Sequence, residues 1–302
     1  MNNQLIVRIS EGLGNQFFMY SNAYALSKKI GYKLFIDDES SYRNKSIRLY
    51  LLNNFNITGK IVSDDLKFNN YTKNFFRKLK IRIDKFKKYK EFLIEATDIN
   101  KQTSYHNYLN NILLNQNVYL EGHFESEKYF INERNNIINE FTLTNEKQYK
   151  DNKYLYNFHN ENIVSICVRQ NRFSERIDNK SDLSCIKKSK LFVKDTIDYI
   201  KRAEILIESK ITNPKYFVWS DDFTNLSEYF PNNKYTFVIN DENKALNDFY
   251  LFKNCKYFIV GPTTFHWWGA WLSNFDNKIC IRPKNLNPSS NINFWPESWL
   301  VI

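Results

Sequence analysis

Three features in the second half of the sequence could do chemistry on a phosphorylated nucleotide. Arg169 directly follows an apolar stretch, residues 163–168, and its guanidinium could hold a phosphate through two hydrogen bonds. The run Thr263-Thr264-Phe265 offers hydroxyls and backbone N–H groups at the start of an expected helix. Asp248 carries a carboxylate, the natural partner of guanine's two adjacent donors. Taken singly, each also has a structural explanation, such as a surface ion pair for Arg169 or a helix cap for Asp248.

A fourth feature lies near the start of the chain, in the run Gly12-Leu13-Gly14-Asn15-Gln16. The chain has only 7 glycines in 302 residues, so two of them in one turn are informative. A glycine turn between a strand and a helix brings backbone N–H groups toward an anion. The run is not a G-x-G-x-x-G motif, because Phe17 stands at its last position. By itself it is as consistent with a structural turn as with a phosphate site.

The apolar patterning predicts the α/β framework that must position these residues. Strands are expected at residues 5–9, 32–36, 118–120, 163–168, 216–219, 237–239, 257–260 and 279–281, and helices after residue 16 and at 192–207, 248–253 and 263–272. Two successive α/β halves predict two doubly wound domains, whose ligands bind at the carboxyl ends of strands. The polar stretch 145–162 is the expected linker, which gives domains 1–155 and 156–302. Residues 40–117 show no clear pattern.

The positive charge of the chain is concentrated in one segment. The net charge is +10, and residues 73–90 alone hold nine Lys or Arg and one Asp, a net +8. The same segment has apolar residues at helical spacing, namely Phe76, Leu79, Ile83, Phe86 and Tyr89. We expect a basic helical insert at about 70–93 of the first domain. Three readings stay open: a helix lying on an anionic membrane surface, a solvated helix whose stripe packs on the domain, or a helix that binds nucleic acid.

Several classes of protein are excluded by composition and spacing. No stretch of about 18 apolar residues could span a bilayer, and Arg8 interrupts the place where a signal peptide would have its apolar core. The four cysteines lack metal-ligand spacing and suggest buried free thiols in a reducing cytoplasm. Asp221-Asp222 lacks the spacing of a metal-binding D-x-D pair. None of the familiar nucleic-acid-binding motifs is present.

Five segments, in order along the chain, closely resemble the signatures of the α-1,2-fucosyltransferases of glycosyltransferase family 11. They are Gly12-Leu13-Gly14-Asn15-Gln16, Gly122-His123-Phe124-Glu125-Ser126-Glu127-Lys128-Tyr129-Phe130, Trp219-Ser220-Asp221-Asp222, Asp248-Phe249-Tyr250-Leu251 with Cys255-Lys256, and Thr263-Thr264-Phe265-His266-Trp267-Trp268-Gly269-Ala270-Trp271-Leu272. The resemblance covers nearly the whole chain except about residues 40–117. The helical spacing of the three tryptophans in the last segment favours a core position.

The resemblance implies a GT-B fold, two Rossmann-like domains facing across a cleft, and inverting, metal-independent transfer of L-fucose from GDP-fucose. Arg169 would then hold the diphosphate and stabilise the leaving group, and Asp248 would read the guanine. The other residues implied at the donor are Gly14, Asn15, Gln16, Thr263, Thr264 and Phe265. His123 and Glu125 would lie on the acceptor side. Cations and helix N-termini at the diphosphate lower the barrier as GDP leaves an oxocarbenium-like sugar, so no metal or other cofactor is expected.

The chain also departs from the family signature. The family's H-x-R-R-x-D corresponds to Cys167-Val168-Arg169-Gln170-Asn171-Arg172, which keeps only the first arginine. Glu11 replaces the signature's first glycine, and Pro262 replaces an asparagine. These changes put some donor contacts in doubt and make GDP-colitose, essentially a 3-deoxy-fucose donor, a plausible variant substrate.

No residue is assigned as the catalytic base. The available carboxylates are Glu11, Asp37, Glu175 and Asp178, and each is explained more simply as a surface or structural residue. The sequence leaves the oligomeric state open.

The predicted function is transfer of fucose to the 2-hydroxyl of a galactose-type residue in an O-antigen repeat unit. The acceptor would be a free or polyprenyl-linked galactoside, and the enzyme would be cytoplasmic and peripheral at the inner face of the plasma membrane. The alternatives are transfer of another GDP-6-deoxyhexose such as colitose, or a non-catalytic nucleotide-sugar or RNA-binding protein. Nucleic acid is not an expected partner.

Overall fold

The computed structural model describes residues 3–42, 48–95, 116–160, 162–176, 179–240 and 244–302, without the side chains of residues 159 and 160. The chain forms two compact units, Met1–Asn145 with Ser289–Phe294, and Glu146–Pro288 with Trp295–Ile302. The domain boundary predicted from the sequence follows residue 155, whereas residues 146–155 belong to the second unit. One reason is that Tyr149 packs on Tyr250 of that unit, with ring centroids 5.8 Å apart.

The first unit is built on a parallel sheet with the strand order β3-β2-β1-β5-β4. Its strands are β1 (Gln4–Arg8), β2 (Lys33–Asp37), β3 (Lys60–Ile61), β4 (Phe92–Ile94) and β5 (Val118–Glu121). In this order β1 and β5 are neighbours, and they pair in register from Leu5↔Val118 to Val7↔Leu120. This point, where successive crossovers run in opposite directions, is the topological switch point of the sheet, where ligands bind in open α/β folds.

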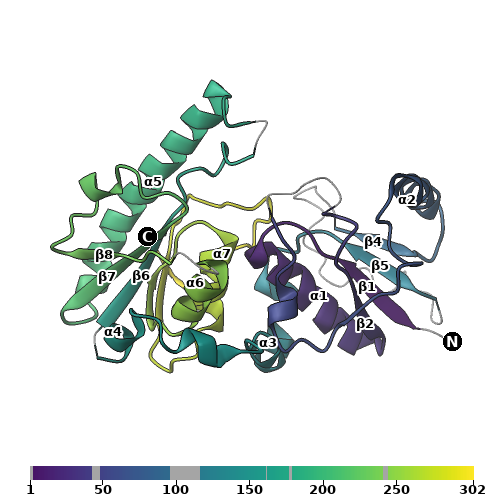
Figure 1. Ribbon diagram of the computed structural model, residues 1–302, viewed down its shortest axis with the longest axis horizontal. Coiled ribbons are helices and arrows are strands. Elements are labelled where there is room, and N and C mark those ends of the chain that lie inside the picture. The colour runs from purple at the N-terminus through teal and green to yellow at the C-terminus, as the bar shows by residue number, and fades with distance from the viewer. Residues whose placement is uncertain (1–2, 43–47, 96–115, 161, 177–178, 241–243) are drawn as a thin grey trace. The chain divides into compact units, whose positions relative to one another are not determined.

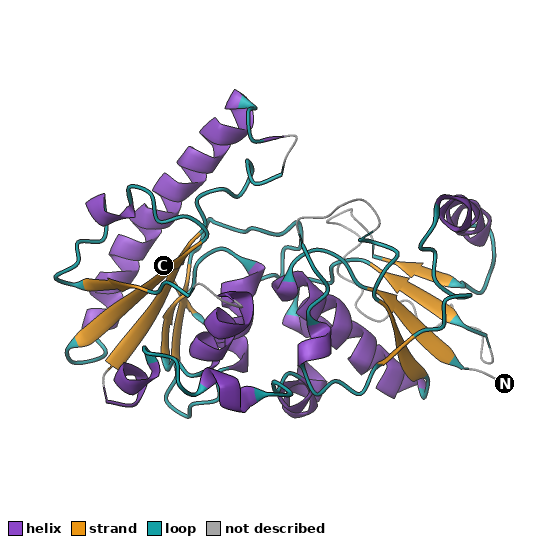
Figure 2. Ribbon diagram, viewed as in Figure 1, coloured by secondary structure: helices purple, strands orange, loops and turns teal. Residues whose placement is uncertain are grey.

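Helices and short 3₁₀ turns complete the first unit (Figures 1 and 2). They are α1 (Leu13–Ile30), α2 (Tyr71–Asp84), α3 (Arg134–Glu140), η1 (Leu52–Asn54), η3 (Glu127–Tyr129) and η4 (Ile131–Glu133). Helix α1 is buried on nearly every face, which explains its run of aromatic residues. It ends at Gly31, whose φ of 70° is the left-handed conformation that glycine adopts without strain.

The second unit is built on a parallel sheet with the strand order β11-β10-β9-β6-β7-β8. Its strands are β6 (Asn162–Val168), β7 (Pro214–Ser220), β8 (Tyr235–Phe237), β9 (Tyr257–Ile259), β10 (Ile279–Arg282) and β11 (Leu300–Val301). Counted within the unit, this is the order 3-2-1-4-5-6 of dinucleotide-binding doubly wound sheets. The switch point therefore lies between β6 and β9, which pair from Val164↔Tyr257 to Ile166↔Ile259.

Four α-helices are described in the second unit, and Figure 1 shows α6 and α7 lying side by side. The helices are α4 (Leu155–Asn160), α5 (Leu183–Glu208), α6 (Lys244–Lys253) and α7 (Thr264–Leu272), with η5 (Glu146–Tyr149) and η7 (Leu226–Glu228). Gly269 allows the close contact of α6 and α7, because a Cβ at this position would lie 2.4 Å from the Cβ of Phe252. The three tryptophans of α7 are buried, as predicted.

The strands of the second unit were predicted more closely than its helix ends. Helix α5 begins nine residues before the predicted start at residue 192, and β8 ends at Phe237, where the predicted strand began. Strands β3 and β4 were missed because they have only two and three residues and lie in the polar region 40–117. All four cysteines are free; Cys185 is partly exposed and the others are buried.

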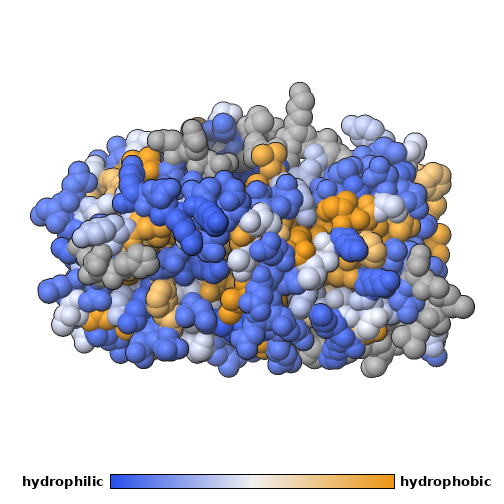
Figure 3. All heavy atoms as spheres, turned by 60° about the horizontal axis from the view of Figure 1, so that its bottom comes forward, coloured by the Kyte–Doolittle hydropathy of each residue, from blue (hydrophilic) through white to orange (hydrophobic). Residues whose placement is uncertain are grey.

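Hydrophilic residues cover most of the face shown in Figure 3, with apolar residues in smaller groups among them. No helix within the described part of the chain is both long enough and apolar enough to cross a membrane.

Candidate active site

The carboxyl ends of β6 and β9 bring the predicted donor residues of the second unit together. Arg169 directly follows β6, and the segment Gly261–Thr264 leads from β9 into α7. The two backbones approach so closely that a Cβ on Gly261 would lie 2.1 Å from the carbonyl oxygen of Cys167. Burial, with a smaller contribution from the neighbouring charges of Asp221 and Asp248, raises the pKa of Cys167 to about 12. Cys167 therefore stays a neutral thiol at the centre of this site.

Helix α7 begins with its N-terminus organised for an anion. The Thr263 hydroxyl oxygen accepts a hydrogen bond from the His266 backbone N–H at 3.1 Å, and the Thr263 carbonyl accepts from Trp267. The backbone N–H groups of Thr264 and Phe265 take part in neither of these two bonds, and both residues are half-buried. Backbone N–H groups in this position, together with the helix dipole, stabilise negative charge.

His266 holds the turn before α7 in place from the inside of the unit. Its Nδ1 accepts a hydrogen bond from the Gly261 N–H at 2.9 Å, and its Nε2 lies 2.7 Å from the Ser165 hydroxyl on β6. Burial lowers the pKa of His266 to about 3, so the ring is neutral at physiological pH. With Nδ1 accepting, the remaining proton lies on Nε2, which donates to Ser165.

Asp248 lies inside α6, four residues after its start, so the alternative role of a helix cap is wrong. Its side chain is 6% exposed, and its Oδ1 accepts a hydrogen bond from Asn240 at 2.7 Å. Burial raises the pKa of Asp248 to about 6, and the bond from Asn240 and the charge of Lys244 oppose that rise. These two groups offset only part of the cost of burying the negative charge. A ligand that donates two hydrogen bonds to the carboxylate would therefore stabilise its ionised form.

Arg169 forms an ion pair with Glu175, and each side chain is about a quarter exposed (24% and 25%). The guanidinium therefore already bonds a carboxylate. A diphosphate could take the same position because two of its oxygens can accept from the same guanidinium fork and it carries more negative charge.

The residues after Arg169 show what replaced the family pattern. The side-chain amide of Gln170 donates to the carbonyls of Asp222 and Thr224, both at 2.8 Å. Arg172 donates to the carbonyl of Pro288 at 2.5 Å, and its guanidinium lies over the rings of two phenylalanines. Asp221 accepts from the backbone N–H groups of residues 170 and 171 at 2.6 and 3.1 Å. The acidic pair at 221–222 thus fixes the turn after β6.

In the first unit, the glycine turn leads into α1 at the carboxyl end of β1. Gly12 caps the helix without a side-chain hydrogen bond, and Gly14 is buried. The Gln16 side chain is fully buried: its amide nitrogen donates to the carbonyls of Glu11 and Leu49, and its oxygen accepts from Leu51. Gln16 would therefore act on a diphosphate by shaping the turn. The buried Oδ1 of Asn15 has no hydrogen-bond partner among the described residues.

Glu11 has a φ of 62°, in the left-handed region that favours glycine. This conformation explains why the family signature has glycine at this position. Non-glycine residues held in such a conformation cluster at functional sites, where the surrounding structure imposes them.

The turn after β5 holds the two predicted acceptor-side residues. His123 is exposed and Glu125 is half-buried. Glu95, at the end of β4, organises this turn: its Oε2 accepts from the N–H groups of His123 and Phe124 at 2.7 and 2.9 Å. Gly122 is required because a Cβ there would lie 2.3 Å from the Cβ of Glu95.

Two residues with a role at these strand ends were not predicted from the sequence. Glu95 lies in the region without a readable pattern, and β4 before it has only three residues. His266 stands in the α7 signature where the family has serine, and that difference was the one available signal.

The remaining candidates for a catalytic base are placed as follows. Asp37 is 1% exposed, and its Oδ1 accepts from the backbone of Ser40 at 3.0 Å, so it stabilises the end of β2. Glu175 is engaged with Arg169, and Asp178 lies outside the described residues. Within the described part of the chain, no group of three or more His, Cys, Asp or Glu side chains could hold a metal ion.

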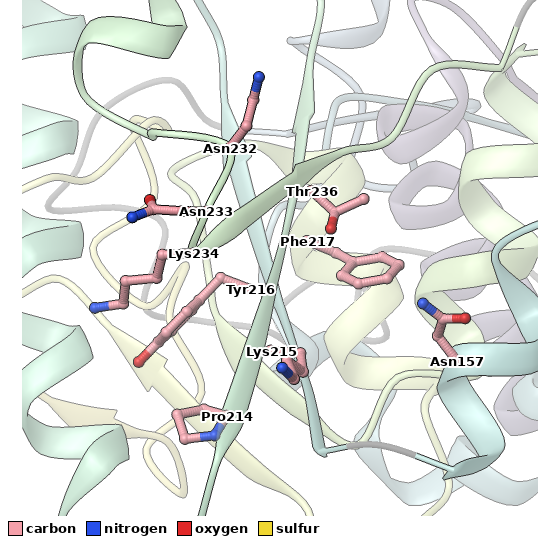
Figure 4. A pocket seen from close by; sticks show the side chains of 9 residues that line it. All are labelled: Asn157, Pro214, Lys215, Tyr216, Phe217, Asn232, Asn233, Lys234 and Thr236. Carbon is pink, nitrogen blue, oxygen red and sulfur yellow. The ribbon is translucent and has the colours of Figure 1, made fainter.

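One depression in the second unit lies at the amino ends of β7 and β8 (Figure 4). Its lining residues are Asn157, Pro214, Lys215, Tyr216, Phe217, Asn232, Asn233, Lys234 and Thr236. It is formed by the amino ends of these strands, whereas the predicted donor residues are at the carboxyl ends of β6 and β9. It has no part in the candidate site.

Comparison with known proteins decides the family. The family model of glycosyl transferase family 11 matches residues 2–297 of the chain. The chain belongs to glycosyltransferase family 11. It is 27% identical to an α-1,2-colitosyltransferase of Escherichia coli over 99% of this chain and 98% of that protein. It is 28% identical to the O-antigen biosynthesis glycosyltransferase WbnK of Escherichia coli over 97% of this chain and 99% of that protein.

The fold of this family 11 glycosyltransferase is shared with solved structures. The fucosyltransferase NodZ from Bradyrhizobium matches with a TM-score of 0.53 at 17% sequence identity, over 92% of this chain and 97% of that chain. A mutant of Arabidopsis thaliana FUT1 in complex with GDP matches with a TM-score of 0.53 at 13% identity, over 95% of this chain and 72% of that chain. The predicted GT-B fold, built from two parallel-sheet Rossmann-like domains, is confirmed.

Proposed function

We propose that this family 11 glycosyltransferase transfers L-fucose from GDP-fucose to the 2-hydroxyl of a galactose-type residue in an O-antigen repeat unit, with inversion and without a metal. The observation that carries the proposal is the convergence of Arg169, the α7 N-terminus and Asp248 at the switch point of the second sheet. These groups match a diphosphate and a guanine. NodZ, which shares the fold, has been studied soaked with GDP-fucose, and FUT1 in complex with GDP.

Donor binding follows from the charges of these groups. Ionised Asp248 accepts hydrogen bonds from N1–H and the 2-amino group of guanine, a pattern that uracil cannot offer. Arg169 exchanges Glu175 for the diphosphate, and the N–H groups of Thr264 and Phe265 add fixed partial positive charge. GDP then leaves with its growing negative charge already neutralised, which lowers the barrier to an oxocarbenium-like transition state.

The acceptor hydroxyl attacks the sugar from the face opposite GDP. No carboxylate is assigned as the base that takes the proton of this hydroxyl. On the acceptor side we assign His123 and Glu125, in the turn that Glu95 holds.

A second donor is favoured by a specific observation. The E. coli relative at 27% identity is an α-1,2-colitosyltransferase. In this chain Gln170 and Arg172 replace an arginine and an acid of the family pattern, and both side chains bind backbone carbonyls of their own unit. GDP-colitose is therefore the alternative substrate.

We propose that the enzyme works at the cytoplasmic face of the plasma membrane, on a repeat unit carried by a polyprenyl lipid. The relative WbnK is named for O-antigen biosynthesis. The basic segment around α2 supports contact with an anionic surface.

The test is release of GDP on mixing the purified protein with GDP-fucose or GDP-colitose and a soluble galactoside, with and without EDTA. We expect turnover that EDTA leaves unchanged, and loss of turnover by more than about 100-fold in Arg169→Ala, which removes a bidentate charged contact. Arg176→Ala, an exposed arginine nearby, is the matched control. Absence of turnover with either donor would refute the proposal, and inhibition by EDTA would refute its metal-independent part.

A further inference from the structure

Helix α2 carries its apolar residues on the side that faces away from the first unit. Phe75, Phe76, Leu79 and Ile83 are 63%, 58%, 42% and 52% exposed, and Phe86 just beyond the helix is 92% exposed. The reading in which this stripe packs on the domain is therefore wrong. Large apolar side chains gathered on one exposed helix face indicate a surface that another apolar medium covers.

The attached face of α2 is polar. Arg77 is 9% exposed and pairs with Glu121 at the end of β5, its Nε donating at 2.6 Å. Asp84 is 3% exposed and accepts from the backbone N–H groups of Glu91 and Phe92 at 3.0 and 2.9 Å. Only Ile81 of the helix packs against the apolar cluster beneath it. Figure 1 shows α2 beside β4 and β5. The helix is thus fixed to its unit by hydrogen-bonded charges, an arrangement that keeps the apolar side outward.

Cations border the exposed apolar face on both sides. At about 100° per residue, Lys78 and Arg82 fall on one flank of the stripe and Lys80 on the other. No ion pair is described for Lys78 or Arg82, and Lys80 reaches Glu91 only at 3.4 Å with its side chain 53% exposed. An apolar strip between rows of cations matches the boundary between acyl chains and anionic headgroups.

We propose that α2 is the membrane-docking element of this enzyme, lying flat on an anionic bilayer with Phe75, Phe76, Leu79, Ile83 and Phe86 inserted below the headgroups. The occupant is lipid, because the apolar strip needs a hydrocarbon phase and the flanking cations need phosphates. The value of this membrane docking for catalysis rests on the proposed function, since only a lipid-linked acceptor makes docking useful.

Docking through α2 acts directly on the acceptor side. Glu121, the partner of Arg77, is the last residue of β5, and His123 follows it by two residues. The same carboxylate lies 3.6 Å from Arg8 at the end of β1. A bilayer held by α2 therefore keeps the carboxyl edge of the first sheet, with its switch point, at a fixed distance from the headgroups.

The test is co-sedimentation of the purified full chain with vesicles of phosphatidylcholine alone or mixed with phosphatidylglycerol, without substrates. We expect binding only to the mixed vesicles. A charge variant, K78Q/R82Q/K85Q, should bind about 100-fold more weakly, at about 1 kcal/mol per cation. An apolar variant, F75S/F76S/L79S, should lose binding by at least as much.

Matched controls come from helix α5 of the second unit, which also has exposed cations and exposed apolar residues. K187Q/K188Q/K190Q and L183S/L191S/I205S should bind the mixed vesicles like the parent chain. Equal binding to neutral vesicles, loss of binding only in the α5 variants, or binding to single-stranded RNA in place of vesicles would each overturn the proposal.

Transfer assays separate this inference from the proposed function. The two α2 variants should lose at least tenfold in transfer to a lipid-linked galactoside in vesicles and keep their rate on a soluble galactoside. Full activity of the apolar variant on the vesicle-bound acceptor would overturn the docking role. Inactivity of every protein on the soluble acceptor would instead refute the proposed function and leave the vesicle binding result standing.

Discussion

The turns that lead into helices α1 and α7 are held in place by different kinds of contact. Each helix follows a strand at the switch point of its sheet and presents its N-terminus there. The α7 turn is held by residues within or beside it, through Thr263 and His266. The α1 turn has no side-chain cap and depends on Gln16, which bonds residues more than thirty positions away. The second unit therefore carries a turn fixed mainly by local contacts, and the first unit a turn fixed by a distant loop.

The largest expected effect breaks the α1 turn. Gln16→Ala removes three hydrogen bonds and leaves the carbonyls of Glu11 and Leu49 and the N–H of Leu51 without them, which should lower the free energy of unfolding by about 2–4 kcal/mol. Urea denaturation measures this loss. Gln116→Ala, which removes a single described bond to the Lys90 carbonyl, is the control and should cost under about 1.5 kcal/mol. Equal costs for the two variants would contradict the assigned role of Gln16.

The next effect concerns the donor side. Asp248→Asn removes a charge that burial disfavours, since the pKa of Asp248 is raised to about 6. An acid with a raised pKa stabilises the fold below its ordinary pKa and loses that contribution as pH rises through about 6. At pH 7.5 the parent chain therefore buries an ionised carboxylate at a cost that the neutral amide avoids. The variant should be about 2–3 kcal/mol more stable at this pH. It should also lose most of its affinity for GDP.

The same group predicts how donor affinity depends on pH. Only the ionised carboxylate accepts both guanine donors, so the parent chain should bind GDP more weakly as pH falls through about 6. Calorimetric titrations at several pH values measure this. Asp248→Asn is the control, because it should lack this dependence; a parent affinity that stays constant down to pH 5 would exclude Asp248 from guanine binding.

A smaller effect tests the locally fixed turn. His266→Ser restores the residue of the family signature and removes the acceptor of the Gly261 N–H, so donor affinity should fall about tenfold while the α1 turn is untouched. Because the pKa of His266 is lowered to about 3, the parent ring stays neutral, and the loss should be the same at pH 6 and pH 8. An unchanged GDP affinity would show that the turn does not need the imidazole.

The smallest expected effect is a gain. Glu11→Gly places glycine at a φ of 62° and should stabilise the chain by about 1 kcal/mol in thermal unfolding. Glu133→Gly, at a φ of −105° where glycine has no advantage, should destabilise it. Destabilisation by Glu11→Gly would mean that the Glu11 side chain contributes more than its strained backbone costs.

The two turns also show how far the sequence could be read. The α7 turn was predicted as a helix start with hydroxyls and N–H groups, because Thr263 and the helix it begins are neighbours in the sequence. That the Thr263 side chain caps the helix came from the structure. The Gln16 contacts could not be predicted, since they depend on a loop brought near only by the folded sheet. The same holds for Glu95, which becomes visible only when β4 pairs with β5.

For the basic segment around α2, the sequence predicted the helix but not its orientation on the unit. Its charge and helical spacing were evident, but which side faces the unit was not, because buried ion pairs such as Arg77 with Glu121 are rare and periodicity favours burying the apolar side. Asp248 was found for its chemistry, yet its place inside α6 rather than at its cap came from the structure.

The central claim is that the carboxyl edge of the second sheet binds a guanine diphosphate. Isothermal titration of the parent chain with GDP and with UDP at pH 7.5 tests it most directly. The account predicts that GDP binds at least about tenfold more tightly than UDP, since a site built to pair both guanine donors leaves a buried carboxylate unpaired with uracil. Equal affinity for the two nucleotides, or tighter binding of UDP, would contradict it.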